Sequence, residues 1–89
     1  MKHEAPIRIL VKQDAGGFFG QCLEYDIATQ ADSMDELRNR MSCLIQIELR
    51  YAAESKLNID PAPKAYHKMW DVVSFQEHGG YQFGELKAA

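Results

Sequence analysis

The segment Ser33-Met34-Asp35-Glu36 has the pattern of a capping box, in which a hydroxyl and a carboxylate close the first turn of a helix. The Ser33 hydroxyl can accept a hydrogen bond from the Glu36 amide, and the Glu36 carboxylate can accept one from the Ser33 amide. Acidic side chains in this turn also complement the positive end of the helix dipole. Because no proline follows until Pro61, the pattern predicts one long helix that ends near Lys56.

Two apolar stripes run along this predicted helix. The first has the spacing of a face that packs on a sheet, and it consists of Leu37, Met41, Leu44, Ile45 and Ala52. The second consists of Cys43, Ile47 and Tyr51. A small sheet covers only one side of a helix, so we expect the second stripe to meet either the segment after Pro61 or a second copy of the chain.

Three short strands are predicted before the helix. The branched aliphatic run Ile7–Val11 favours a strand, and Asp14-Ala15-Gly16-Gly17 favours a tight connection after it. Phe18–Leu23 resumes a strand-like composition, and the alternation within Tyr25–Thr29 predicts a third strand. We therefore expect an antiparallel meander that precedes the long helix.

The region after the helix leaves two interpretations open. Two prolines in Asn58–Pro63 indicate a linker that changes the chain direction. Beyond it, Pro63 can begin a short helix that reaches about Val72, or Val72–Gln76 can form a fourth strand. His78-Gly79-Gly80 predicts a turn, and Tyr81–Phe83 can add a few extended residues. The expected fold class is α+β, with a three- to four-stranded antiparallel sheet backed by one long helix and a short C-terminal helix or strand.

The amino-acid composition is that of a small globular domain and argues against some classes of function. The chain has 89 residues, of which 46% are hydrophobic and 26% charged, as in a small globular domain. A core this small favours self-association, so we expect a homodimer. The net charge of −3 argues against a protein that mainly neutralises phosphates. With two cysteines outside any CxxC motif and no apolar signal or membrane segment, we expect a cytoplasmic protein.

Glu24 and Asp26 are the acidic pair that could support chemistry. Two residues apart on a regular strand, their carboxylates would share one face and could bind a divalent cation or act as acid and base. A ribonuclease H-like two-metal site needs carboxylates from separate elements, and Ile7–Val11 contributes none. We therefore predict no catalytic residues and interpret both groups as solvent-facing at a strand connection.

Metal-binding and nucleic-acid-binding groups are also present. His3, His67, His78, Cys22 and Cys43 lack the close spacing of a zinc site, so we predict no metal and no cofactor. A second cluster combines aromatic and basic groups, Lys64, Tyr66, His67, Lys68 and Trp70, and could stack on single-stranded bases. We favour a different interpretation, in which Tyr66, Met69 and Trp70 pack on the core or on a partner while the basic groups face water.

The stretch Cys22-Leu23-Glu24-Tyr25-Asp26-Ile27-Ala28-Thr29-Gln30, followed by the capped helix start, resembles the HicB-like antitoxin family. Ala31 stands where that family usually has glycine. The resemblance covers roughly residues 7–57 and implies a partial ribonuclease H-like α+β sandwich. Family antitoxins bind and block HicA, a small mRNA-cleaving toxin, and a separate C-terminal module binds operator DNA.

The resemblance implies a HicB-like α+β domain at residues 1–60 with a C-terminal extension at 61–89. That extension offers neither a helix pair nor a basic recognition segment, so we do not expect DNA binding. The predicted function is a protein-interaction module that masks a small basic toxin. The predicted partner or dimer contacts are Cys43, Ile47, Tyr51, Tyr66 and Trp70. The alternatives are a ribonuclease H-like metal-dependent hydrolase and a weak nucleic-acid binder that uses residues 64–70.

Overall fold

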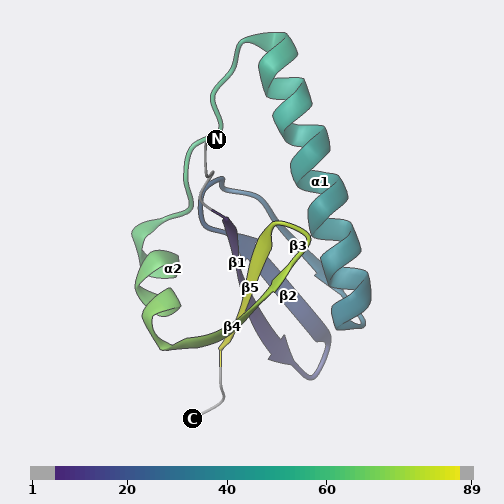
Figure 1. Ribbon diagram of the computed structural model, residues 1–89, viewed down its shortest axis with the longest axis vertical. Helices are drawn as coiled ribbons and strands as arrows, with labels where there is room; N and C mark the ends of the chain where they lie inside the picture. Colours follow the sequence, from purple (N-terminus) through teal and green to yellow (C-terminus); the bar gives the residue numbers. More distant parts are fainter. Residues whose placement is uncertain (1–5, 87–89) are drawn as a thin grey trace.

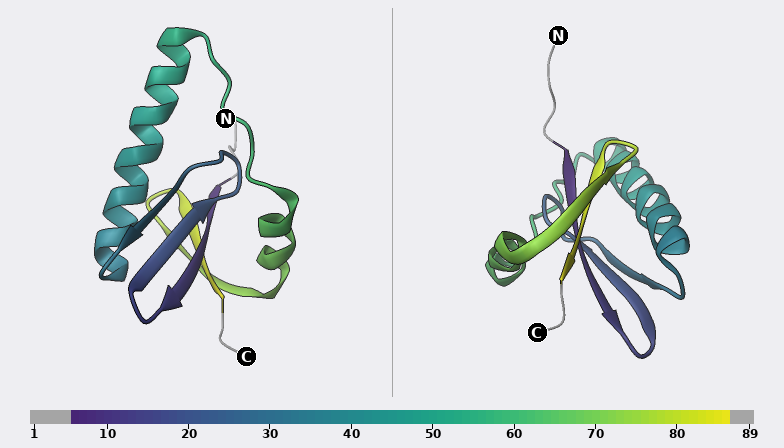
Figure 2. Two further views of the ribbon diagram at one scale, coloured as in Figure 1. Left: turned by 180° about the vertical axis from the view of Figure 1, so that it is seen from behind. Right: turned by 60° about the horizontal axis from the view of Figure 1, so that its bottom comes forward.

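A long helix lies across one face of a five-stranded sheet, and a short helix packs against the opposite face (Figures 1 and 2). The computed structural model describes residues 6–86. In chain order the elements are β1 (Ile7–Asp14), β2 (Gly17–Cys22), β3 (Ala28–Ala31), α1 (Met34–Ser55), α2 (Lys64–Met69), a 3₁₀ turn (Trp70–Val72), β4 (Val73–His78) and β5 (Tyr81–Leu86). The α+β class is thereby confirmed.

The sheet differs from the expected one in strand number and in direction. Its strand order is β3-β2-β1-β5-β4, and β1 pairs antiparallel with β2 but parallel with β5. After α2 the chain first forms the outer strand β4 and then turns back at Gly79 and Gly80, both at positive φ, so that β5 lies between β4 and β1. The three- to four-stranded, wholly antiparallel prediction is therefore wrong. Residues 73–86 add two strands to the sheet that residues 7–31 begin.

The predicted third strand is displaced along the chain. Instead of Tyr25–Thr29, the strand is Ala28–Ala31, because Tyr25 to Ile27 forms a tight bend. In that bend the Ile27 amide donates to the Tyr25 carbonyl at 2.7 Å, and the Cys22 amide donates to the Ile27 carbonyl at 2.9 Å. Local hydrogen bonds thus replace the ladder that the alternating pattern predicted.

The helix boundaries follow from its caps. The Ser33 Oγ accepts a hydrogen bond from the Glu36 amide at 3.1 Å, as predicted. The returning bond differs, since the Glu36 carboxylate accepts from the Asp32 amide at 3.4 Å and not from Ser33. At the other end Lys56 adopts the left-handed conformation, and its amide donates to the last turn. The helix therefore ends within one residue of its predicted end.

Each face of the sheet has its own apolar cluster, because successive residues of β1 point to opposite faces. Ile9 and Val11 face α1, and Leu10 faces α2. The cluster under α1 consists of Ile9, Val11, Cys22, Ile27, Ala31, Leu37, Met41, Ile45 and Phe83. The smaller cluster under α2 consists of Leu10, Leu23 and Ala62, with Tyr66, Trp70, Val73 and Leu86 half-buried around it. Leu44 of the predicted inner stripe is only half-buried.

Backbone hydrogen bonds hold the link between α1 and α2 against the bend that follows β2. The Ala62 amide donates to the Leu23 carbonyl at 3.1 Å, and the Asp26 amide donates to the Asp60 carbonyl. These bonds carry the chain from the α1 side of the sheet to the α2 side. In the part of the chain that the structure describes, no helix has the length and apolar character needed to cross a membrane.

Candidate protein-interaction surfaces

Glu24 and Asp26 do not form an acidic pair on one strand face. Glu24 forms an ion pair with Arg8. Its carboxylate accepts a hydrogen bond from the Arg8 backbone amide at 2.6 Å and lies 2.7 Å from the Arg8 guanidinium. Asp26 accepts instead from the side-chain amide of the buried Gln21 at 3.1 Å. The two carboxylates thus hold different parts of the bend after β2, and Glu24 is half-buried and ion-paired, unlike the solvent-facing group that we predicted.

The predicted metal-capable groups are dispersed. Cys22 is buried in the α1-facing cluster, where burial raises the pKa of its thiol above the ordinary value, whereas Cys43 is exposed on α1. His67 lies on α2 and His78 at the end of β4, and His3 lies outside the described residues. Across residues 6–86, no three His, Cys, Asp or Glu side chains come together as possible ligands of one metal ion.

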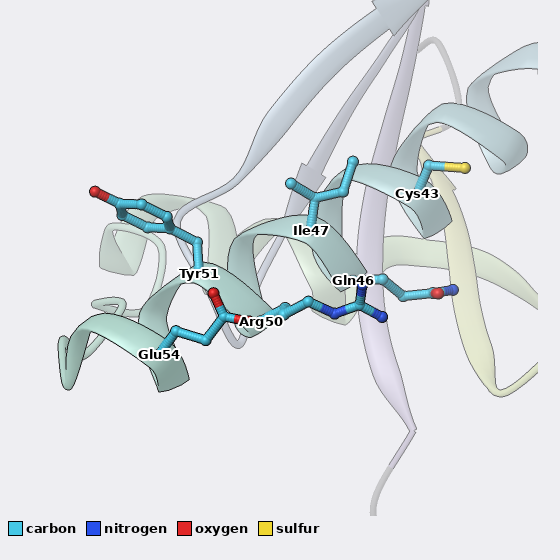
Figure 3. Close-up of a pocket in the computed structure, with 6 residues that line it drawn as sticks. All are labelled: Cys43, Gln46, Ile47, Arg50, Tyr51 and Glu54. Atoms are coloured by element: carbon cyan, nitrogen blue, oxygen red, sulfur yellow. The ribbon is translucent and has the colours of Figure 1, made fainter.

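The second helix stripe lies together on the side of α1 that faces away from the sheet. Figure 3 shows Cys43, Ile47 and Tyr51 along this side. Ile47 is 63% exposed and Tyr51 is 61% exposed, so these two neighbouring side chains keep most of their surface in contact with water. With Gln46, Arg50 and Glu54 they line a hollow of about 430 Å³. We call the exposed face formed by Arg40, Cys43, Ile47, Tyr51 and Glu54 the outer α1 face.

Tyr66 and Trp70 lie on the other side of the sheet, so the five predicted interface residues do not share one surface. Both rings are half-buried against the Leu10 cluster. The Arg8 guanidinium lies over the Trp70 ring, with its Cζ atom 5.9 Å from the ring centroid. The Trp70 ring also stacks on Phe75, with the two ring centroids 6.0 Å apart. The basic groups beside them lie on α2, where Lys64 and Lys68 are exposed and His67 is half-buried. The aromatic rings of residues 64–70 therefore pack inward.

Gly84 lets Trp70 approach the sheet this closely. A Cβ atom at Gly84 would lie 2.5 Å from the Trp70 Cζ3 atom and 2.6 Å from a Val73 methyl group. Phe75 lies opposite Gly84 on the neighbouring strand and stacks on the same Trp70 indole ring. The inner side of β4 is thus fixed by an aromatic contact, while Phe75 itself stays 52% exposed.

β4 forms an open edge of the sheet that sequence reasoning did not identify as a surface. It pairs with β5 on one side only, and five of its six residues are exposed. Its α1-facing side borders a hollow of about 320 Å³ that Met34 and Arg38 of α1 also line, together with Glu85 of β5. No Lys or Arg occurs between Trp70 and Leu86, whereas the acidic residues Asp71, Glu77 and Glu85 are all exposed. This segregation of charge was the signal that could have identified the edge. We call Phe75 and Glu77 of β4, together with Asp71 of the preceding turn and Glu85 of the neighbouring strand β5, the acidic β4 edge.

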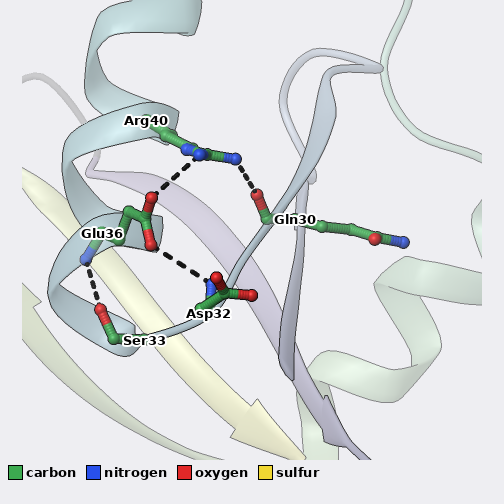
Figure 4. Close-up of polar contacts among 5 residues, drawn as sticks. All are labelled: Gln30, Asp32, Ser33, Glu36 and Arg40. Atoms are coloured by element: carbon green, nitrogen blue, oxygen red, sulfur yellow. Dashed lines mark hydrogen bonds and ion pairs between the residues drawn. The ribbon is translucent and has the colours of Figure 1, made fainter. Parts of the chain in front are cut away.

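The opposite edge, β3, is closed by α1. An Arg40 guanidinium nitrogen donates to the Gln30 carbonyl at 2.8 Å, and a second one binds the Glu36 carboxylate at 2.9 Å (Figure 4). Ala31 at the end of this strand is buried beneath the helix. A helix side chain therefore occupies a backbone acceptor that would otherwise face a partner strand.

Comparison of this chain with protein-family models, with curated proteins and with solved structures finds no match in any of the three. Its candidate sites are the two surfaces that its own geometry leaves open, the outer α1 face and the acidic β4 edge.

Proposed function

We propose that the protein is a HicB-like protein-interaction module that binds a small basic protein of the HicA mRNA-cleaving type along the acidic β4 edge. In this proposal it masks the partner and contributes no catalytic residue. The observation that carries the proposal is the coincidence, at one open edge of the sheet, of unpaired backbone groups and an exposed aromatic ring on β4 with three exposed acidic residues in a segment that contains no Lys or Arg.

The backbone of β4 supplies the first part of the binding energy. An edge strand presents a row of free N–H and C=O groups, and a partner strand can add to it by main-chain hydrogen bonds. Proteins that avoid such pairing usually place Lys or Pro on the edge, and Val73–His78 contains neither. The edge is therefore competent to accept a strand from another protein.

The aromatic pair Phe75 and Trp70 supplies an anchor. Interfaces depend on a few rigid aromatic side chains whose burial is completed by the partner. Phe75 is half-exposed but cannot collapse onto the surface, because it is already stacked on the Trp70 ring. It loses little conformational entropy on binding, so burying its free face favours the complex.

Charge selects the class of partner. Asp71, Glu77 and Glu85 carry three negative charges in a segment without Lys or Arg, so a basic surface is attracted and an acidic one repelled. Ribonucleases that hold RNA phosphates are basic proteins, which fits the family's toxin class. This complementarity favours fast association that slows as salt is added.

The test is to identify any small basic protein encoded beside the gene, to co-express it with this chain, and to measure complex formation and mRNA cleavage. We expect a complex in which cleavage stops. Glu77→Lys combined with Glu85→Lys should weaken binding at least tenfold, and Phe75→Ser should weaken it similarly. Ile47→Ser on the outer α1 face is the matched control and should bind like the wild-type chain.

Two results would overturn the proposal. Either no small basic protein encoded beside the gene binds this chain, or the β4-edge variants bind as tightly as the control. Circular dichroism of each variant establishes that the chain is folded before its binding is compared.

A further inference from the structure

The exposed positions along α1 have a symmetric spacing. Arg40, Cys43, Ile47, Tyr51 and Glu54 follow one another at intervals of three, four, four and three residues, and residues at these intervals share one side of a helix. We propose that two copies of this chain associate through their outer α1 faces, with the two helices antiparallel and Ile47 on the twofold axis.

The symmetric spacing makes this face complementary to itself. In an antiparallel pair centred on Ile47, residues at equal distances before and after this position come opposite each other. Cys43 then faces the partner's Tyr51, and Arg40 faces the partner's Glu54. A twofold contact requires this kind of self-complementarity, because the same patch serves both subunits.

The end charges decide the direction of the helices. Arg40 marks one end of the face and Glu54 the other, so an antiparallel pair joins opposite charges twice. A parallel pair would instead place Arg40 against Arg40 and Glu54 against Glu54. Like charges at an interface are strongly unfavourable, so the antiparallel arrangement is selected.

Both charged groups can reach a partner across this face. Glu54 has no ion-pair partner among residues 6–86, and in Figure 3 the Arg50 side chain extends away from it. Arg40 is held in place by Gln30 and Glu36, but a guanidinium carries five N–H donors and its side chain remains 54% exposed. The guanidinium is thus positioned before a partner carboxylate arrives.

The apolar centre and charged ends match the layout of protein interfaces, which have an apolar core and a polar rim. Ile47 and Tyr51 form the centre, and each is more than half exposed in the single chain. From residue 40 to residue 54 the helix spans about 21 Å, which gives an interface at the small end of the stable range. We therefore expect a dimer that dissociates on dilution. It leaves the acidic β4 edge free, so this inference is independent of the proposed function.

Disulfide trapping tests the register directly. On mild oxidation, Ile47→Cys in a Cys43→Ser background should form a covalent dimer, because residue 47 meets itself on the axis. Tyr51→Cys should also form one by bonding to the partner's Cys43, and this bond should disappear when Cys43→Ser is added. The wild-type chain should form none, since two Cys43 residues lie far apart in the antiparallel pair.

Charge exchange tests the direction by sedimentation over a range of concentrations. Arg40→Glu alone and Glu54→Arg alone should each weaken self-association at least tenfold. A mixture of the two variants should form a mixed dimer. At one end of that dimer the introduced glutamate meets the introduced arginine, and at the other end the native Arg40 of one chain meets the native Glu54 of the other.

The proposal fails if the wild-type chain stays monomeric at the highest concentration. It also fails if wild-type chains crosslink through Cys43, which indicates a parallel pair, or if a dimer forms that neither the charge variants nor the trapping positions affect, which places the contact elsewhere. Thermal melts of each variant at low concentration establish that folding is intact.

Discussion

The two edges of the sheet differ in how far other parts of the chain cover them. β3 is short, its last residue lies under α1, and Arg40 occupies one of its backbone carbonyls. β4 is longer and almost wholly exposed, and it is stiffened only from one face by Trp70. α1 packs mainly against β3 and β2, so a single helix protects one edge and leaves the other open. The position of the helix over the sheet thus determines which edge can receive a partner.

The largest effect should come from loosening α1 from the sheet that it covers. Ile45 is fully buried, so Ile45→Asp places an unpaired charge in the core and should cost more than about 4 kcal/mol, enough to unfold a domain of this size. Ile47→Asp, two residues away, should change the free energy of unfolding by less than about 0.5 kcal/mol at low protein concentration. Urea denaturation followed by circular dichroism measures both. Similar losses for the two variants would contradict the observed orientation of α1.

A smaller effect is expected from the support of the β4 edge. Gly84→Ala forces the Trp70 ring away from the sheet and should cost about 2 kcal/mol. Tryptophan fluorescence should report greater exposure of the indole ring to water. Gly16→Ala is the matched control, because its added Cβ atom would meet only Asp14 at 3.4 Å. If Gly84→Ala is as stable as this control, Trp70 does not hold the edge.

Next in size is the closure of the β3 edge. Arg40→Met keeps the length of the side chain but removes its hydrogen bonds to Gln30 and Glu36, which should cost about 0.5–1 kcal/mol. Arg50→Met removes the same charge from α1 almost three turns further along the helix and should have a smaller effect. Hydrogen exchange should also become faster in Ala28–Ala31 for the first variant only. Equal exchange rates in the two variants would show that Arg40 does not protect this edge.

The smallest effect concerns pH and separates the buried thiol on β2, the strand next to the closed edge, from the exposed thiol on α1. Burial raises the pKa of Cys22, so above the ordinary thiol pKa the unfolded chain loses a proton that the folded chain keeps. Stability should therefore be complete at neutral pH and fall as the pH rises through this range. Cys22→Ala should flatten this slope in denaturation series at alkaline pH, whereas Cys43→Ala should not. A wild-type slope in both variants would assign the loss to other groups.

The sequence predicted the long helix better than any other element, for a physical reason. The Ser33 cap, a stripe at helical spacing and the absence of proline all act within one segment, so local residues alone determine it. The apolar centre of the outer α1 face, Cys43, Ile47 and Tyr51, was predicted from the same pattern as the stripe that no small sheet could cover, whereas its charged ends were not. Such features need no knowledge of distant residues.

The sheet was predicted less well because its strands depend on partners far away in the sequence. The pairing of β1 with β5 and the aromatic stack on β4 are set by residues that meet only in three dimensions. Glu24 was misread for the same reason, since its partner Arg8 lies sixteen positions away on another strand. The open edge could not be predicted because it depends on β5 lying between β1 and β4, which leaves β4 as the outermost strand.

The parallel pairing of β1 with β5 also fixes the order in which the molecule can be completed. Ile7 pairs with Tyr81, so the central strand of the sheet acquires its second neighbour only after β5, far along the chain, has been made. On the ribosome, the meander and α1 emerge first and leave one side of β1 uncovered. Closing such distant contacts is slow, so during synthesis this innermost strand behaves as an edge that needs protection from other nascent chains.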